Sequence, residues 1–126
     1  MRDVIHTDRA PAAVGPYSQA IVCGGLVWVA GQIPLDPSSG RLVGETIEEQ
    51  TERVLLNLRA ILEAAGTGMD RVVRATVYLK DLAEFDAVNA VYARHFGENP
   101  PARACVEVCR LPKGARLEID AVADVS

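Results

Sequence analysis

The segment Pro100-Pro101-Ala102-Arg103-Ala104-Cys105-Val106-Glu107-Val108 decides how the last part of the chain is organised. Its two prolines hold the backbone extended, because proline has a fixed φ and disfavours helix in the residue before it. We therefore predict a strand over 103–109. Side chains alternate along a strand, so Arg103 and Cys105 would share one face, opposite a packing face that contains Val106.

Arg103 opens this predicted strand, and two interpretations of it remain. A guanidinium at a fixed position can hold a planar carboxylate of a ligand through two parallel hydrogen bonds. Alternatively, Arg103 forms a structural ion pair with an acidic side chain of its own chain.

Composition predicts one globular domain over residues 1–126, since 49% of the residues are hydrophobic and 24% are charged. The formal net charge of −4 and the absence of consecutive Lys or Arg residues argue against nucleic acid as a partner. No apolar run has the length of a membrane span, and the segment after Met1 lacks an apolar signal region. We expect a cytoplasmic protein that does not associate with membranes.

The three cysteines, Cys23, Cys105 and Cys109, do not predict a disulfide. Cys105 and Cys109 lie four residues apart on the predicted strand, about 13 Å, whereas a disulfide needs Cα atoms within about 7 Å. Together with two histidines, the cysteines show no metal-ligand spacing, so no metal is expected. No glycine motif for phosphates or dinucleotides occurs either, and we expect no cofactor.

Sequence patterns predict five strands and two helices. The runs 20–23 and 26–30 flank Gly24-Gly25 and indicate a β-hairpin. Thr46 and Glu49 form a capping box before a helix that ends near Gly66. The remaining elements are a strand over 72–79, a helix that is capped by Asp81 or its neighbour and ends at Gly97, the 103–109 strand, a turn at 111–114 and a strand over 116–122.

The element order ββαβαββ indicates an α+β fold with a mixed sheet. Two helices cover only one face of such a sheet, and the central strands carry apolar residues on both faces. The second face must therefore meet solvent or another subunit, and we expect another subunit.

Three motifs resemble the RidA/YjgF family of small imine and enamine deaminases: GPYSQAI (15–21), AGQIPLDPSSG (30–40) and NPPARACVEVCRLPKGARLEIDAVA (99–123). The similarity runs from about Ile5 to Ala123. It implies a chorismate-mutase-like fold with two helices on one face of a mixed sheet. It also implies a homotrimer with a central β-barrel and sites between subunits.

The resemblance implies a site with three catalytic residues. Arg103 would bind the substrate carboxylate, Glu118 would activate water, and Tyr17 would reach into a neighbouring subunit's pocket. The turn at 111–113 is expected to bring the polar faces that carry Arg103 and Glu118 close together. The alternatives are an Arg103–Glu118 ion pair and a tyrosine that only anchors its loop.

Four further positions are assigned by the same resemblance. Gly31 would place its backbone against the ligand, Asn89 would line the site, and Cys105 would line the pocket through its backbone. Gly31 is otherwise a turn residue, Asn89 a surface helix residue, and Cys105 a small strand residue rather than a nucleophile. Ala30 replaces the serine common in the family, which affects the fine substrate preference.

The implied activity is hydrolytic deamination of small 2-imino and 2-enamino acids, such as 2-iminobutanoate and 2-iminopropanoate, without a cofactor. An alternative is a non-catalytic or regulatory trimer that binds a carboxylate metabolite. Ribonuclease activity is a third possibility, but the acidic balance disfavours it because RNA affinity rests on Lys and Arg.

Overall fold

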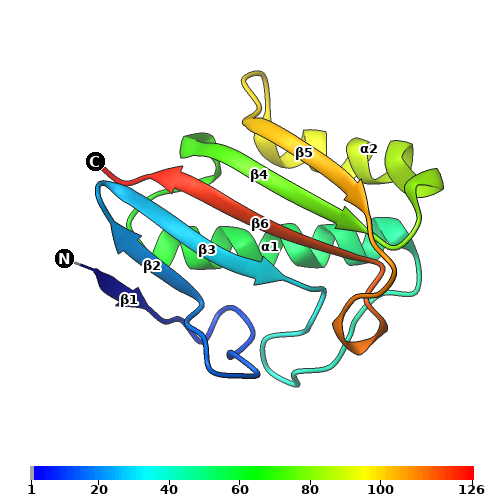
Figure 1. Ribbon diagram of the computed structural model, residues 1–126, viewed down its shortest axis with the longest axis horizontal. Helices are drawn as coiled ribbons and strands as arrows, with labels where there is room; N and C mark the ends of the chain where they lie inside the picture. Colours follow the sequence, from blue (N-terminus) through cyan, green and yellow to red (C-terminus); the bar gives the residue numbers. More distant parts are fainter. Residues whose placement is uncertain (1) are drawn as a thin grey trace.

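A six-stranded mixed sheet, with strand order β1-β2-β3-β6-β4-β5, carries both helices on one face (Figure 1). The computed structural model describes residues 2–126. β4 and β5 are parallel, and the other neighbours are antiparallel. The predicted α+β architecture is confirmed. The elements are β1 (Asp3–Ile5), β2 (Ala20–Cys23), β3 (Leu26–Gln32), α1 (Ile47–Ala64), η1 (Met69–Arg71), β4 (Val72–Leu79), η2 (Leu82–Glu84), α2 (Phe85–Phe96), β5 (Ala102–Glu107), η3 (Pro112–Gly114) and β6 (Leu117–Asp124).

Two local predictions are confirmed in detail. Gly24 and Gly25 adopt φ values of 64° and 76° in the β2–β3 hairpin, a region that favours glycine. Thr46 caps α1 by accepting a hydrogen bond from the Glu49 backbone at 3.1 Å, and the Glu49 carboxylate accepts the Thr46 N–H in return. Asp81 caps the short helix η2 rather than α2, so α2 starts at Phe85.

The strand β1 was not predicted. It has three residues and pairs with β2 so that Val4 lies opposite Ile21. Three residues are too few to show the alternation of apolar and polar side chains that identifies a strand in a sequence. It extends the sheet to an outer edge far from β5 (Figure 1).

The core lies between the sheet and the helices. Alternate residues of β6 from Leu117 to Ala123 point into it, and the residues between them are half-buried on the opposite face. We call that second side, which neither helix covers, the open face. A register shift at the start of β4 leaves Val73 49% exposed, although simple alternation would group it with the buried Ala75 and Val77 of the same strand.

β5 faces the opposite way from the prediction. Its register with β4 places Cys105 beside Val77, which is fully buried, and Cys105 packs against the core. Val106, expected on a packing face, is 42% exposed. The parallel pairing with β4 therefore turns Arg103 and Cys105 toward the helix layer.

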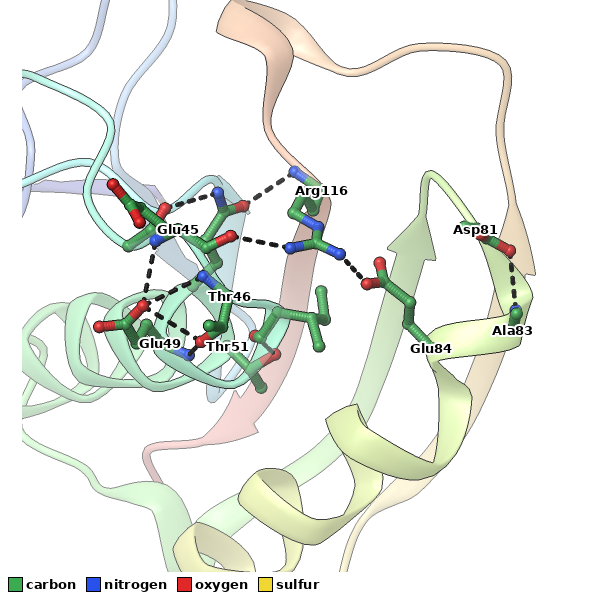
Figure 2. A network of polar contacts seen from close by, with 11 residues as sticks. Glu45, Thr46, Glu49, Thr51, Asp81, Ala83, Glu84 and Arg116 are labelled. Atoms are coloured by element: carbon green, nitrogen blue, oxygen red, sulfur yellow. Dashed lines mark hydrogen bonds and ion pairs between the residues drawn. The ribbon is translucent and has the colours of Figure 1, made fainter.

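Arg116 anchors the start of β6 to both helices (Figure 2). Its backbone N–H donates to Gln50 Oε1 on α1 at 2.9 Å, and its Nη1 donates to the Glu45 carbonyl at 2.9 Å. Its Nη2 forms an ion pair with Glu84 just before α2. These contacts fix the strand end that carries Glu118 two residues later.

Candidate functional site

Arg103 lies in a cradle formed by one stripe of α2. Phe85, Asn89 and Tyr92 are spaced by four and three residues, so they share one helix face. Arg103 Nη1 donates to Asn89 Oδ1 at 2.8 Å. Its guanidinium carbon lies 4.8 Å from the ring centre of Tyr92 and 5.4 Å from that of Phe85, within cation–π range.

No ion pair joins Arg103 to a carboxylate in residues 2–126. The interpretation of Arg103 as a structural ion pair is therefore wrong. An amide oxygen holds the guanidinium without neutralising it, and the charge stays available for an anion.

A cavity of about 350 Å³ adjoins this cradle. Its walls are largely apolar, with Arg103 and Asn89 as the polar contributions, and the lining residues are Asn89, Tyr92, Ala93, Gly97, Pro100, Pro101 and Arg103. The Tyr92 hydroxyl is buried and has no hydrogen-bond partner in the described chain. Burial raises the pKa of Tyr92, and the nearby Arg103 charge partly opposes that shift.

Glu118 lies on the open face, in a second cavity of about 330 Å³ lined by Val14, Tyr17, Ala30, Gly31, Ile33, Pro112 and Glu118. Burial raises the pKa of Glu118, and the negative charge of Asp120 adds to this shift. Gly31 passes so close that an added Cβ would lie 1.9 Å from Glu118 Oε2. The Glu118 carboxylate therefore occupies the space that a side chain at position 31 would need.

Tyr17 lines the same cavity as Glu118 from the loop before β2. It is 48% exposed, and its hydroxyl accepts the Val14 N–H at 3.3 Å. Gln19, buried in this loop, accepts the Thr7 N–H at 2.7 Å and donates to the Pro11 carbonyl at 2.9 Å. Sequence reasoning missed Gln19, since one glutamine before an apolar run does not signal a loop clamp.

The structure does not bring Arg103 and Glu118 together within one chain. β4 separates β5 from β6, which places the two strands about 10 Å apart. Arg103 points to the helix layer and Glu118 to the open face. The prediction that the 111–113 turn makes the two polar faces adjacent was wrong, because β6 pairs with β3 and β4 and not with β5.

Cys105 follows Arg103 on the same face of β5. Burial raises the pKa of the Cys105 thiol, although the Arg103 charge works in the opposite direction. A raised pKa disfavours the thiolate, which agrees with the interpretation of Cys105 as a small strand residue. Cys23, Cys105 and Cys109 are free thiols. Across residues 2–126, no cluster of His, Cys, Asp or Glu has a metal-binding arrangement.

The fold and these two cavities define a small α+β protein with two polar features. An arginine on its edge strand pairs with no carboxylate of residues 2–126, and a half-buried glutamate lies on its open sheet face. A family model described as Endoribonuclease L-PSP matches residues 7–125. The chain belongs to this family, the RidA/YjgF family.

Three proteins illustrate the similarity. A RutC family protein of Pyrococcus horikoshii is 53% identical over 123 residues, 98% of each chain. The human 2-iminobutanoate/2-iminopropanoate deaminase is 47% identical and covers 98% of this chain and 90% of its own. The crystal structure of a putative endoribonuclease from Thermotoga maritima has a TM-score of 0.97 and 51% identity, and covers 100% of this chain and 99% of its own.

Proposed function

We propose that the protein hydrolyses small 2-imino and 2-enamino acids to 2-oxo acids and ammonia. The main supporting observation is Arg103, which Asn89 and two aromatic rings hold in place and which no carboxylate within residues 2–126 neutralises. A fixed, unpaired guanidinium suits a planar carboxylate. The family relationship to the human 2-iminobutanoate/2-iminopropanoate deaminase supports the same substrate class.

The chemistry needs few groups, because the carbon of an imine is already electrophilic. In the proposed mechanism Arg103 binds the carboxylate and Glu118 takes a proton from water as the water oxygen bonds to the imine carbon. Glu118 passes this proton to the imine nitrogen, which has received the electron pair of the C=N double bond, and a carbinolamine forms. The carbinolamine hydroxyl then gives up its proton, the amino group receives a proton, and the C–N bond breaks as the C=O bond forms. The products are ammonia and a 2-oxo acid. The raised pKa of Glu118 makes it a stronger base than an ordinary carboxylate.

We further propose that each site combines Arg103 of one subunit with Glu118 and Tyr17 of another, in a homotrimer. A substrate of three or four carbons cannot span two strands and also reach opposite faces of one sheet. The open face also exposes apolar side chains, among them Trp28 and Val106, which are 48% and 42% exposed. Gly31, Asn89 and Cys105 would complete the lining.

Imine hydrolysis is tested by generating 2-iminopropanoate or 2-iminobutanoate in situ with an amino-acid oxidase and following its lifetime. We expect the protein to shorten that lifetime in proportion to its concentration. A lifetime unchanged by micromolar protein would refute the activity. The alternative, a non-catalytic binder of carboxylate metabolites, predicts binding of 2-oxobutanoate with no effect on imine lifetime.

No helix within residues 2–126 has the length and apolar character that crossing a membrane requires. The cytoplasmic location expected from the sequence stays a prediction.

A further inference from the structure

The stripe of α2 that faces Arg103 contains two aromatic rings whose role the proposed mechanism leaves unexplained. Phe85 and Tyr92 are seven residues apart, which corresponds to about 10.5 Å along a helix axis. The guanidinium carbon lies 5.4 Å from one ring centre and 4.8 Å from the other. The guanidinium therefore contacts both rings, and Asn89, which lies between Phe85 and Tyr92 in the same stripe, accepts its hydrogen bond.

Packing of α2 also fixes the ring of Tyr92. Tyr92 is 5% exposed, and its ring centre lies 4.4 Å from that of Phe96, with the planes tilted by 36°. The Tyr92 hydroxyl makes no hydrogen bond to any described residue. Within the protein, Tyr92 therefore acts on Arg103 through its ring and not through its oxygen.

The free donors of Arg103 show what this arrangement achieves. Only Nη1 donates to another described residue, so the Nε and Nη2 groups remain for a ligand. A long arginine side chain without such contacts occupies several rotamers, and ordering it on binding lowers affinity. The rings and Asn89 hold the guanidinium in one orientation before a ligand arrives.

We propose that Phe85 and Tyr92 are positioning residues that orient Arg103 for binding a carboxylate. They act through Arg103 and do not touch the reacting atoms. This inference rests on the proposed function for the identity of the ligand, a 2-oxo or 2-imino acid. It adds that a ring, and not a hydroxyl, is required at position 92.

The test compares Tyr92→Leu, Phe85→Leu and the conservative Tyr92→Phe. Both leucine variants should raise KM for the imine and the Kd of 2-oxobutanoate by roughly 5- to 30-fold, the range expected for losing one cation–π contact. kcat should change much less, because the water-activating group is elsewhere. Tyr92→Phe keeps the ring and should restore both constants to within about twofold of the parent.

Val88→Ala controls for instability, since Val88 is buried on the same helix and makes no cation–π contact with Arg103. It should lower the melting temperature and leave the Kd of 2-oxobutanoate unchanged. Equal losses of affinity in Val88→Ala and Tyr92→Leu would overturn the proposal by showing a purely structural effect. A loss in Tyr92→Phe as large as in Tyr92→Leu would overturn it in favour of the hydroxyl.

Calorimetric titration with 2-oxobutanoate separates this inference from the proposed activity. If the parent binds 2-oxobutanoate but does not hydrolyse imines, the activity fails while the variants still test the positioning role. If the parent binds no 2-oxobutanoate at millimolar concentration, the positioning role is refuted as well.

Discussion

Replacing Gly31 with alanine tests whether the position of the Glu118 carboxylate controls turnover. An added Cβ would lie 1.9 Å from Glu118 Oε2 and 2.8 Å from its Cδ, whereas real Cβ contacts are almost never shorter than 3.0 Å. The carboxylate oxygen must therefore move by more than 1 Å. Gly31 does not have a positive φ, so alanine fits its backbone without strain.

The expected size of the effect follows from this displacement. Moving a catalytic group by about 1 Å costs about 100-fold in rate, or about 2.7 kcal/mol of activation free energy. Gly31→Ala should therefore lower kcat by about 100-fold. KM should change little because Arg103 lies on another strand. The folded state should tolerate the added methyl group, because the atom that it meets, Glu118 Oε2, is at the free end of a flexible side chain. Removing a glycine also lowers the conformational entropy of the unfolded chain. The melting temperature should therefore stay level or rise.

The assay measures kcat and KM for 2-iminobutanoate generated in situ, with the melting temperature taken on the same sample. Gly15→Ala is the matched control, since its added Cβ would lie 3.6 Å from the Tyr17 ring, an ordinary contact. It should behave like the parent. A folded Gly31→Ala protein with parental kcat would refute the proposed role of Glu118 in water activation.

Three further substitutions test separate parts of the structure. Arg103→Lys keeps the positive charge but removes the planar guanidinium, which can donate two parallel hydrogen bonds. The protein should stay folded while kcat/KM falls roughly tenfold to several thousandfold. A destabilised variant with normal kcat/KM would contradict the proposal that Arg103 binds the substrate carboxylate. Glu118→Gln should abolish turnover and melt above the parent at pH 7, because the raised pKa means that the ionised carboxylate destabilises the folded state. This gain should vanish below about pH 4.5, where Glu118 is protonated in both states, and a gain that persists there would show another origin. Thr46→Ala removes the α1 cap and should cost about 1 kcal/mol of unfolding free energy in urea titrations, with kcat unchanged; no measurable loss would show that the cap is dispensable.

Local structure was predictable where the signal is short-range. The Thr46–Glu49 capping box and the Gly24-Gly25 hairpin are each set by a few neighbouring residues, and both occur as expected. The two prolines before Ala102 likewise predicted an extended segment, and β5 starts directly after them. The α+β class follows from the order of such elements.

The order of the strands in the sheet, and which face of β5 lies against the helices, depend on pairing between distant segments. The periodicity of apolar residues in the sequence carries no information on that pairing. Alternation groups Arg103 with Cys105, but it does not say which side the helices cover. The prediction assumed that the more apolar side of β5, which contains Val106, packs against the core. In the folded chain a guanidinium goes to the helix side, because Phe85, Asn89 and Tyr92 supply two rings and an amide oxygen for it.

The placement of Arg103 and Glu118 on opposite faces leads to the last prediction. If one site takes its arginine from one subunit and its glutamate from the next, Arg103→Ala and Glu118→Gln subunits should complement each other. Each protein alone has no complete site. The two variants are mixed in equal amounts, dissociated and reassembled. A site is intact where a Glu118→Gln subunit supplies Arg103 and the neighbouring Arg103→Ala subunit supplies Glu118. Random assembly in a ring gives this arrangement at about one site in four. Mixed samples should therefore regain about a quarter of the parental activity. Samples that are mixed without subunit exchange should regain no activity. Light scattering and mass spectrometry show whether exchange has occurred. If exchanged samples stay inactive, the site does not combine these two residues across a subunit boundary, and since one chain holds them about 10 Å apart on opposite faces, they would then not act on the same substrate at all.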